Sequence, residues 1–320
     1  MKNRIYRYDN AKCILIFLVL FGHLLECFSG RFPSAIYRTI YLFHMPAFLF
    51  LSGYFSSFHR KRILFRLILP YVVFQTLYLV FDAIILNSSL NIRLQYTTPY
   101  WILWYLFALI IYNLLIPFFD TGIPGQIVFL AASVLLSLLA GYDDSIGYFL
   151  SLSRIITFAP FFLGGYYFKK DRAFFENTSF CFRRIVPVVG VILSVIGILF
   201  AWKTKLAPAV LYGSFSYANA GYSPVQKLFL LVIGYGGIMS IALIPNKKIP
   251  LLSEIRKNTF PIFCLHGFVI RILGKMRLFT HSELGNLAVA GILAVGLMVA
   301  FGNRIVSGLF HAVFSEKVVE

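Results

Sequence analysis

The first apolar segment carries three ionisable residues whose spacing could support acid–base chemistry. Lys12 and His23 are eleven residues apart. In an α-helix that separation makes three turns plus about 20° and rises about 16 Å, so both side chains share one helix face. Glu26 follows His23 by three residues and lies within reach of it. A carboxylate partner can fix the tautomer of an imidazole and raise its basicity, which suits a general base. A histidine that only hydrogen-bonds between two helices would show the same spacing.

Cations also interrupt later apolar segments, where each ionisable group is costly and is therefore a functional candidate. Arg62 belongs to a basic cluster after the second segment, and such clusters commonly set topology. Arg66 and Arg154 lie inside apolar runs, where topology explains a cation less well. Arg154 in particular needs a carboxylate, a group of carbonyls or an anionic ligand as its partner.

Several uncharged polar or aromatic residues are secondary candidates. Ser52 precedes Gly53, and such a pair allows the close approach of another helix or a ligand. His44 and His266 are intramembrane imidazoles, and Trp104 is an ordinary packing residue when taken alone.

The composition is that of a membrane protein. Hydrophobic residues make up 59% of the 320 residues, charged residues make up 13%, and the mean hydropathy is +0.82. A soluble domain has about 45–50% apolar and about 25% charged residues. These values exclude a soluble enzyme, a disordered chain and a disulfide-stapled secreted scaffold. The apolar runs are continuous rather than alternating, which also excludes a porin-type barrel.

The net charge of +17 has a topological explanation, because basic residues hold cytoplasmic loops inside. No basic stretch is interleaved with stacking aromatics outside the apolar runs, so we expect no nucleic-acid partner. The four cysteines show no paired spacing and predict small buried side chains, not a metal site or a disulfide set.

The apolar runs predict an all-α, polytopic helical bundle that forms one domain over residues 1–320. A spanning helix needs about 20 apolar residues. Ten candidate spans follow: 12–30, 36–57, 63–87, 100–119, 125–141 (short, and tilted or partly re-entrant), 146–168, 185–202, 225–244, 251–274 and 285–312.

The distribution of basic residues predicts the orientation of this bundle. With the N-terminus inside, inner segments carry 18 Lys and Arg and outer segments carry 9. Both termini are then cytoplasmic, residues near 176–180 face the cytoplasm and residues near 214–219 face outward.

Several short motifs occur in an order that resembles the acyltransferase 3 family, in its branch of fucose 4-O-acetylase-like proteins and surface-polysaccharide O-acetyltransferases. The matching stretch runs from about residue 6 to 270. The family usually has Arg where Lys12 stands, and its Arg-x-x-Arg motif is replaced by Arg62 and Arg66, which are four residues apart. The motifs are Asp9-x-x-Lys12, His23, Phe43-His44-Met45-Pro46 to Ser52-Gly53-Tyr54, Arg66 with Pro70-Tyr71, Trp104-Tyr105-Leu106, Arg154 with Pro160 to Tyr167, and Ile262-x-x-Leu265-His266.

This resemblance implies a multi-pass enzyme of the cell membrane with acetyl-CoA as co-substrate and no permanently bound cofactor or metal. It would move an acetyl group from cytoplasmic acetyl-CoA to a hydroxyl of a cell-surface or lipid-linked sugar. His23, paired with Glu26, would act as general base or be acylated first. Lys12, Arg62, Arg66 and Arg154 would bind the donor, and the alternative role for Arg66 or Arg154 is to stabilise developing negative charge. Asp9, His44, Ser52, Trp104 and His266 are secondary candidates.

A transporter or flippase for a sugar or a lipid-linked glycan is the alternative, since it too would need buried cations and histidines. Its expected mark is a pair of halves with interrupted helices in corresponding positions, and the sequence shows no such pattern. The outer stretch 203–224, with Tyr212, Tyr217 and Tyr222, either meets the acceptor or is an ordinary interfacial loop.

Overall fold

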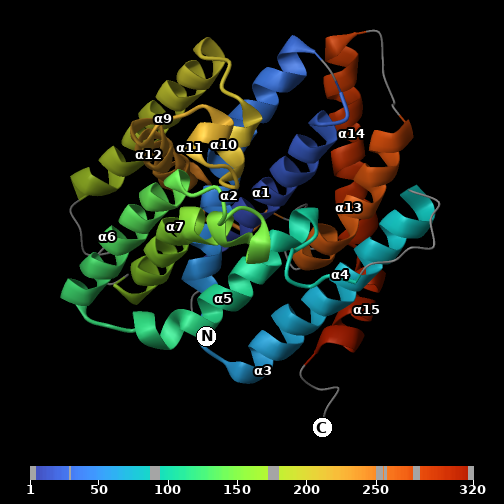
Figure 1. The fold of residues 1–320 in the computed structure, drawn as a ribbon, viewed down its shortest axis with the longest axis horizontal. Coiled ribbons are helices and arrows are strands. Elements are labelled where there is room, and N and C mark those ends of the chain that lie inside the picture. Colours follow the sequence, from blue (N-terminus) through green and yellow to red (C-terminus); the bar gives the residue numbers. More distant parts are fainter. Residues whose placement is uncertain are drawn as a thin grey trace.

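The computed structural model describes residues 5–28, 30–86, 94–171, 180–249, 255, 258–276 and 282–315. In these ranges the chain is helical and has no β-strand, so the predicted all-α class is confirmed (Figure 1). The helices are α1 (Tyr6–Leu25), α2 (Arg31–Phe55), α3 (Arg60–Ile63), α4 (Leu69–Phe81), α5 (Trp104–Phe119), α6 (Ile123–Leu139), α7 (Leu152–Lys170), α9 (Phe180–Lys203), α10 (Pro208–Tyr212), α11 (Tyr217–Ala220), α12 (Pro224–Ser240), α13 (Thr259–Met276), α14 (Glu283–Phe301) and α15 (Arg304–Phe314).

Within the described ranges, nine helical stretches are long and apolar enough to cross a membrane. Helix α2 is not among them, although its 25 residues are enough to span a membrane. It runs through the middle of the bundle and packs against α1, α7 and α12 (Figure 1). The nine stretches are Tyr6–Leu25, Arg60–Leu86, Trp101–Phe119, Ile123–Tyr142, Phe149–Lys170, Arg184–Lys203, Pro224–Leu243, Thr259–Met276 and Glu283–Phe301.

Two of the predicted spans need correction. The fifth is a full helix, because α6 continues through a 3₁₀ turn to Tyr142 and reaches 20 residues. The tenth is wrong as one continuous span over 285–312: α14 ends at Phe301 and a separate helix, α15, begins at Arg304. Asn303 causes the break, because its side chain accepts a hydrogen bond from the backbone N–H of Val306 and caps α15.

The ninth span begins later than predicted, at Thr259, and most of its expected first turns lie outside the described residues. The cytoplasmic stretch predicted near 176–180 also lies almost wholly outside them.

Helices α2 and α7 approach each other closely at two glycines. A Cβ on Gly53 would overlap the backbone carbonyl oxygen of Phe162, and a Cβ on Gly165 would overlap that of Phe50. Small residues let backbones come together in this way inside membranes. The close approach expected at Ser52-Gly53 is therefore present, and it fixes the centre of the bundle.

The stretch 203–224 folds back onto the bundle as α10 and α11. Leu211, Tyr217 and Tyr222 are buried in a cluster with Leu42 of α2. Ser216 caps the N-terminus of α11, because its side chain accepts a hydrogen bond from the backbone N–H of Asn219. This stretch is thus a packed part of the molecule, and α10 reaches the site described next.

Candidate active site

His23 lies at the end of α1 within a network of charged and phenolic groups. Its Nδ1 is 3.2 Å from Oε1 of Glu26 and 3.0 Å from the hydroxyl of Tyr41. The Tyr41 hydroxyl in turn donates to Oε1 of Glu26 at 2.7 Å. The side chain of His23 is 14% exposed and that of Glu26 is 34% exposed, so the pair is sheltered but reachable. The predicted pairing of His23 with Glu26 is therefore present.

Two further tyrosines extend this network from Oε1 of Glu26. Tyr37 of α2 donates to Oε1 of Glu26 at 3.1 Å, and its hydroxyl oxygen lies 2.6 Å from that of Tyr212 in α10. Because the Tyr37 proton goes to Glu26, Tyr212 is the donor in the second bond. The network thus links α1, α2 and α10 and fixes the position of Glu26.

This arrangement determines which nitrogen of His23 carries the proton. Glu26 can only accept, and Tyr41 uses its proton toward Glu26, so Nδ1 of His23 must be a donor. The neutral ring then has its lone pair on Nε2, and a carboxylate behind the ring stabilises the cation that forms when Nε2 takes a proton. The Nε2 lone pair of His23 can therefore accept a proton, which is what general-base chemistry requires.

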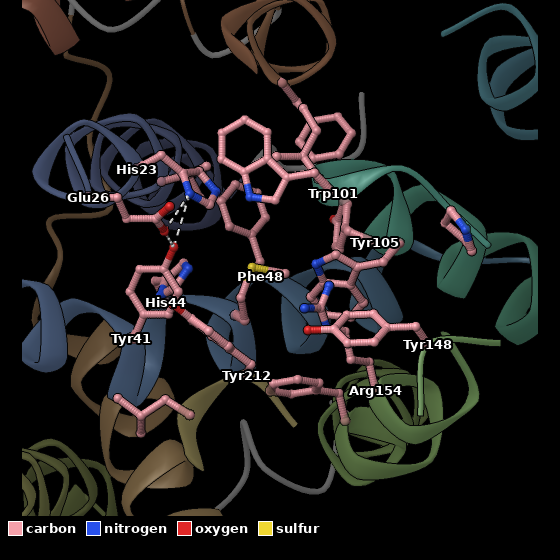
Figure 2. Close-up of a pocket in the computed structure, with 18 residues that line it drawn as sticks. His23, Glu26, Tyr41, His44, Phe48, Trp101, Tyr105, Tyr148, Arg154 and Tyr212 are labelled. Atoms are coloured by element: carbon pink, nitrogen blue, oxygen red, sulfur yellow. Dashed lines mark hydrogen bonds and ion pairs between the residues drawn. The ribbon is translucent and has the colours of Figure 1, made fainter. Parts of the chain in front are cut away.

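A cavity of about 230 Å³ opens beside this network. Figure 2 shows His23, Glu26 and Tyr41 on one side of it, with Arg154 and Tyr148 on the other. Trp101 comes within 4.8 Å of the His23 ring, centroid to centroid. We call this space the histidine cavity; its lining residues are Val19, His23, Glu26, Tyr41, His44, Met45, Phe48, Pro99, Trp101, Ile102, Trp104, Tyr105, Tyr148, Arg154, Phe158, Leu211, Tyr212 and Phe263.

A second cavity of about 510 Å³, the basic cavity, lies at the other end of α1 and carries three cations, Lys12, Arg62 and Arg66. The Lys12 ammonium lies 3.5 Å from the centroid of the Phe55 ring. Arg66 falls in a π-helical turn, Leu64–Ile68, because Pro70 has no N–H to offer the Arg66 carbonyl. The structure therefore brings together three of the four cations predicted to bind a donor.

The two cavities share a wall made of Phe48, Tyr105 and Phe263. A hydrogen bond of 2.6 Å joins the hydroxyls of Ser52 and Tyr105 at this wall. Ser52 lines the basic cavity, whereas Tyr105 lines both.

One face of α1 follows both cavities along their length. Lys12 and Ile16 line the basic cavity, and Val19 and His23, at spacings of three and four residues, line the histidine cavity. The shared helix face expected for Lys12 and His23 is thus the face that both cavities use.

The remaining predicted residues occupy supporting positions. His44 and His266 are both buried. Nδ1 of His44 lies within hydrogen-bond distance of the Ile40 carbonyl, and Nδ1 of His266 lies within hydrogen-bond distance of the Phe263 carbonyl. The His266 ring lies 5.7 Å from that of His23, while Trp104 lines the histidine cavity.

Asp9 lies in the first turn of α1 and lines neither cavity. Arg154 lies in the histidine cavity and not with the other three cations.

Comparison with known proteins decides the family. The family described as "Acyltransferase domain" (Acyl_transf_3) matches residues 5–302. The chain belongs to the acyltransferase 3 family. No solved structure matches this acyltransferase-family chain.

Two relatives of this acyltransferase-family chain match over short stretches. Nodulation protein NolL of Mesorhizobium japonicum is 32% identical over 123 residues, which is 32% of this chain and 33% of the relative. Nodulation protein NolL of Sinorhizobium fredii is 43% identical over 60 residues, 17% of this chain and 16% of the relative. The chain therefore matches about a third or less of the length of these curated relatives.

Sequence reasoning missed Tyr37 and Tyr41, although α2 carried a readable signal for them. Tyr37, Tyr41, His44, Phe48 and Ser52 recur at intervals of three and four residues and so form one helix face. A polar and aromatic stripe in an intramembrane helix predicts a cavity rather than lipid. No comparable signal points to Phe263 of α13, whereas Tyr212 of α10 belongs to the stretch 203–224, for which the sequence left open a contact with the acceptor.

Proposed function

We propose that the protein transfers an acetyl group from cytoplasmic acetyl-CoA to a hydroxyl of a cell-surface or lipid-linked sugar at the outer face of the cell membrane. The observation that carries this proposal is the pair of cavities: one holds three cations, the next holds His23 and Glu26, and only a wall of three aromatic side chains separates them. Membership of an acyltransferase family favours this function over the alternative of a transporter or flippase.

The basic cavity suits the phosphates of coenzyme A. Lys12, Arg62 and Arg66 offer the positive charge that phosphates need, and arginine adds two parallel donors. The pantetheine arm would follow the α1 face past Ile16 and bring the thioester through the wall to His23. The extended pantetheine arm must cover about 16 Å, which is the rise along α1 from Lys12 to His23.

The reaction follows from the tautomer of His23. Nε2 takes the proton of the acceptor hydroxyl while the oxygen attacks the thioester carbonyl carbon. The tetrahedral intermediate collapses by breaking the carbon–sulfur bond, and the proton passes from Nε2 to the leaving thiolate. The products are the acetyl ester and free coenzyme A, and Glu26 stabilises the transient imidazolium.

Two measurements test this function together. Purified protein should release free thiol from acetyl-CoA, and glycan from producing cells should carry an acetyl mass increment that glycan from gene-deleted cells lacks. Absence of both would refute the proposal.

Removal of the Lys12 cation should raise the Michaelis constant for acetyl-CoA by about 10-fold with little effect on kcat. One charge-assisted contact contributes about 1.5–3 kcal/mol, and this one is remote from the reacting carbon. Lys12→Ala should show the loss, and Lys12→Arg should keep most of the affinity because the cation persists. Donor titrations check both variants. Parental titration curves for both would mean that Lys12 has no part in donor binding.

The orientation can be tested with single cysteines in a background without the four native ones. Ala218 in α11 and Lys248 after α12 are both exposed. On intact cells an impermeant maleimide should label Ala218→Cys, and it should label Lys248→Cys only after permeabilisation. The reverse pattern would put the basic cavity outside, away from cytoplasmic acetyl-CoA.

A further inference from the structure

We propose that Arg154 binds an anionic group of the acceptor, a carboxylate or a phosphate, and so places an acceptor hydroxyl beside His23. This inference rests on the proposed function and narrows it, because it names the chemical class of the acceptor.

Among the residues that the structure describes, Arg154 has polar and aromatic neighbours but no counter-ion. Its Nε donates to the hydroxyl of Ser214 at 2.6 Å, and its guanidinium carbon lies 5.2 Å from the Trp104 ring and 5.3 Å from the Tyr148 ring. In the part of the chain that the structure describes, no carboxylate forms an ion pair with it. A hydroxyl and two rings orient a guanidinium without neutralising it.

The histidine cavity holds one carboxylate, and that carboxylate is already engaged. Glu26 accepts from Tyr37 and Tyr41 and pairs with His23 on the other side of the cavity (Figure 2). A cation inside a membrane protein without an anion is costly, and such a residue normally marks a substrate site. The missing charge is therefore best supplied by the ligand.

The position of Arg154 separates it from the donor phosphates. Three other cations line the basic cavity, and the aromatic wall stands between that cavity and Arg154. Arg154 also lies across the histidine cavity from His23 (Figure 2), whereas the reacting carbonyl must come beside His23. An anion held at Arg154 would therefore belong to the acceptor.

The surroundings favour an anionic group on a small ring. A guanidinium offers two parallel N–H donors that match the two oxygens of a carboxylate or a phosphate. Arg154 is the third residue of α7, so the positive end of that helix dipole adds to the attraction. A cavity of about 230 Å³ is smaller than most drug-sized pockets. It suits one sugar residue that carries its charge and its reactive hydroxyl on opposite sides.

The experiment uses membranes that contain the full chain, acetyl-CoA labelled in its acetyl group, and glycan from gene-deleted cells. Anion exchange divides this glycan, including its lipid-linked forms, into neutral and anionic fractions. The anionic fraction should receive at least about 10 times more label per sugar. Carbodiimide-mediated reduction of carboxylates and phosphatase treatment, applied separately, then identify which anion is required. Label chiefly in the neutral fraction overturns the proposal.

Variants connect this preference to Arg154. Arg154→Gln should raise the Michaelis constant for the anionic fraction by about 10-fold or more and leave that for acetyl-CoA unchanged, while Arg154→Lys should recover part of the loss. Lys203→Gln, which removes an exposed cation at the end of α9, is the matched control and should behave as the parent. An increase confined to the Michaelis constant for acetyl-CoA would assign Arg154 to the donor and overturn the proposal.

The experiment distinguishes failure of the anionic-acceptor proposal from failure of the proposed acetyl transfer. A parent protein that releases thiol from acetyl-CoA but labels only neutral glycan refutes the anionic acceptor and leaves acetyl transfer standing. A parent protein that does not use acetyl-CoA refutes both.

Discussion

Replacement of His23 by Asn should reduce acetyl transfer by about 100-fold or more while the protein still folds. Acid–base catalysis by a positioned side chain contributes about 10²–10⁴-fold, and Asn cannot take a proton near neutral pH. Asn can keep a hydrogen bond to Tyr41 or Glu26, the groups that now contact Nδ1. One lost interhelical hydrogen bond typically costs only about 1 kcal/mol in a membrane protein. The measurement is transfer rate per mole of monodisperse protein.

His44 and His266 provide matched controls for this result. Both are buried imidazoles near His23, and each has Nδ1 beside a backbone carbonyl of its own helix. We expect smaller losses when either is replaced by Asn. A monodisperse His23→Asn protein with a parental transfer rate would contradict the mechanism and make one of these two imidazoles the leading candidate.

The second large effect concerns the packing of α2 against α7. Gly165→Val should destabilise the folded protein by about 3 kcal/mol, at the upper end of what overpacking usually costs. The added side chain would collide with the Phe50 carbonyl, which is part of a helix backbone and cannot rotate away. The two helices must then separate, and they carry His44 and Arg154 respectively.

Gly291→Val in α14 is the control for that substitution, because a Cβ there meets nothing within 4 Å. Size-exclusion profiles and thermal melts in the same detergent compare the variants. A Gly165→Val protein that melts with the parent would show that α2 and α7 do not need their present separation.

The sequence was sufficient for the fold class but not for every helix boundary. Continuous apolar runs predict spanning helices because the bilayer accepts few other structures. The same hydropathy criterion gave no sign of the break at Asn303, since a short apolar helix follows it and the hydropathy stays high. The predicted span 36–57 falls on α2, a helix at the centre of the bundle whose polar residues face a cavity.

The candidate site was predictable where it lies on one helix. Helical geometry alone relates Lys12, His23 and Glu26, and the structure keeps all three in the expected relation. The prediction that grouped Arg154 with the donor-binding cations depended on how α7 packs, which no spacing along the chain reveals. The wall of Phe48, Tyr105 and Phe263 joins three helices and could not be predicted for the same reason.

The central claim is that the acetyl group enters at the basic cavity and leaves from the histidine cavity on the other side of the membrane. Sealed membrane vesicles of known orientation test it directly, since acetyl-CoA does not cross a bilayer. Externally added labelled acetyl-CoA should label lumenal glycan in inside-out vesicles, and His23→Asn should abolish that labelling. Right-side-out vesicles should remain unlabelled until acetyl-CoA is loaded inside them. Equal labelling of intact right-side-out vesicles by external acetyl-CoA would contradict the account.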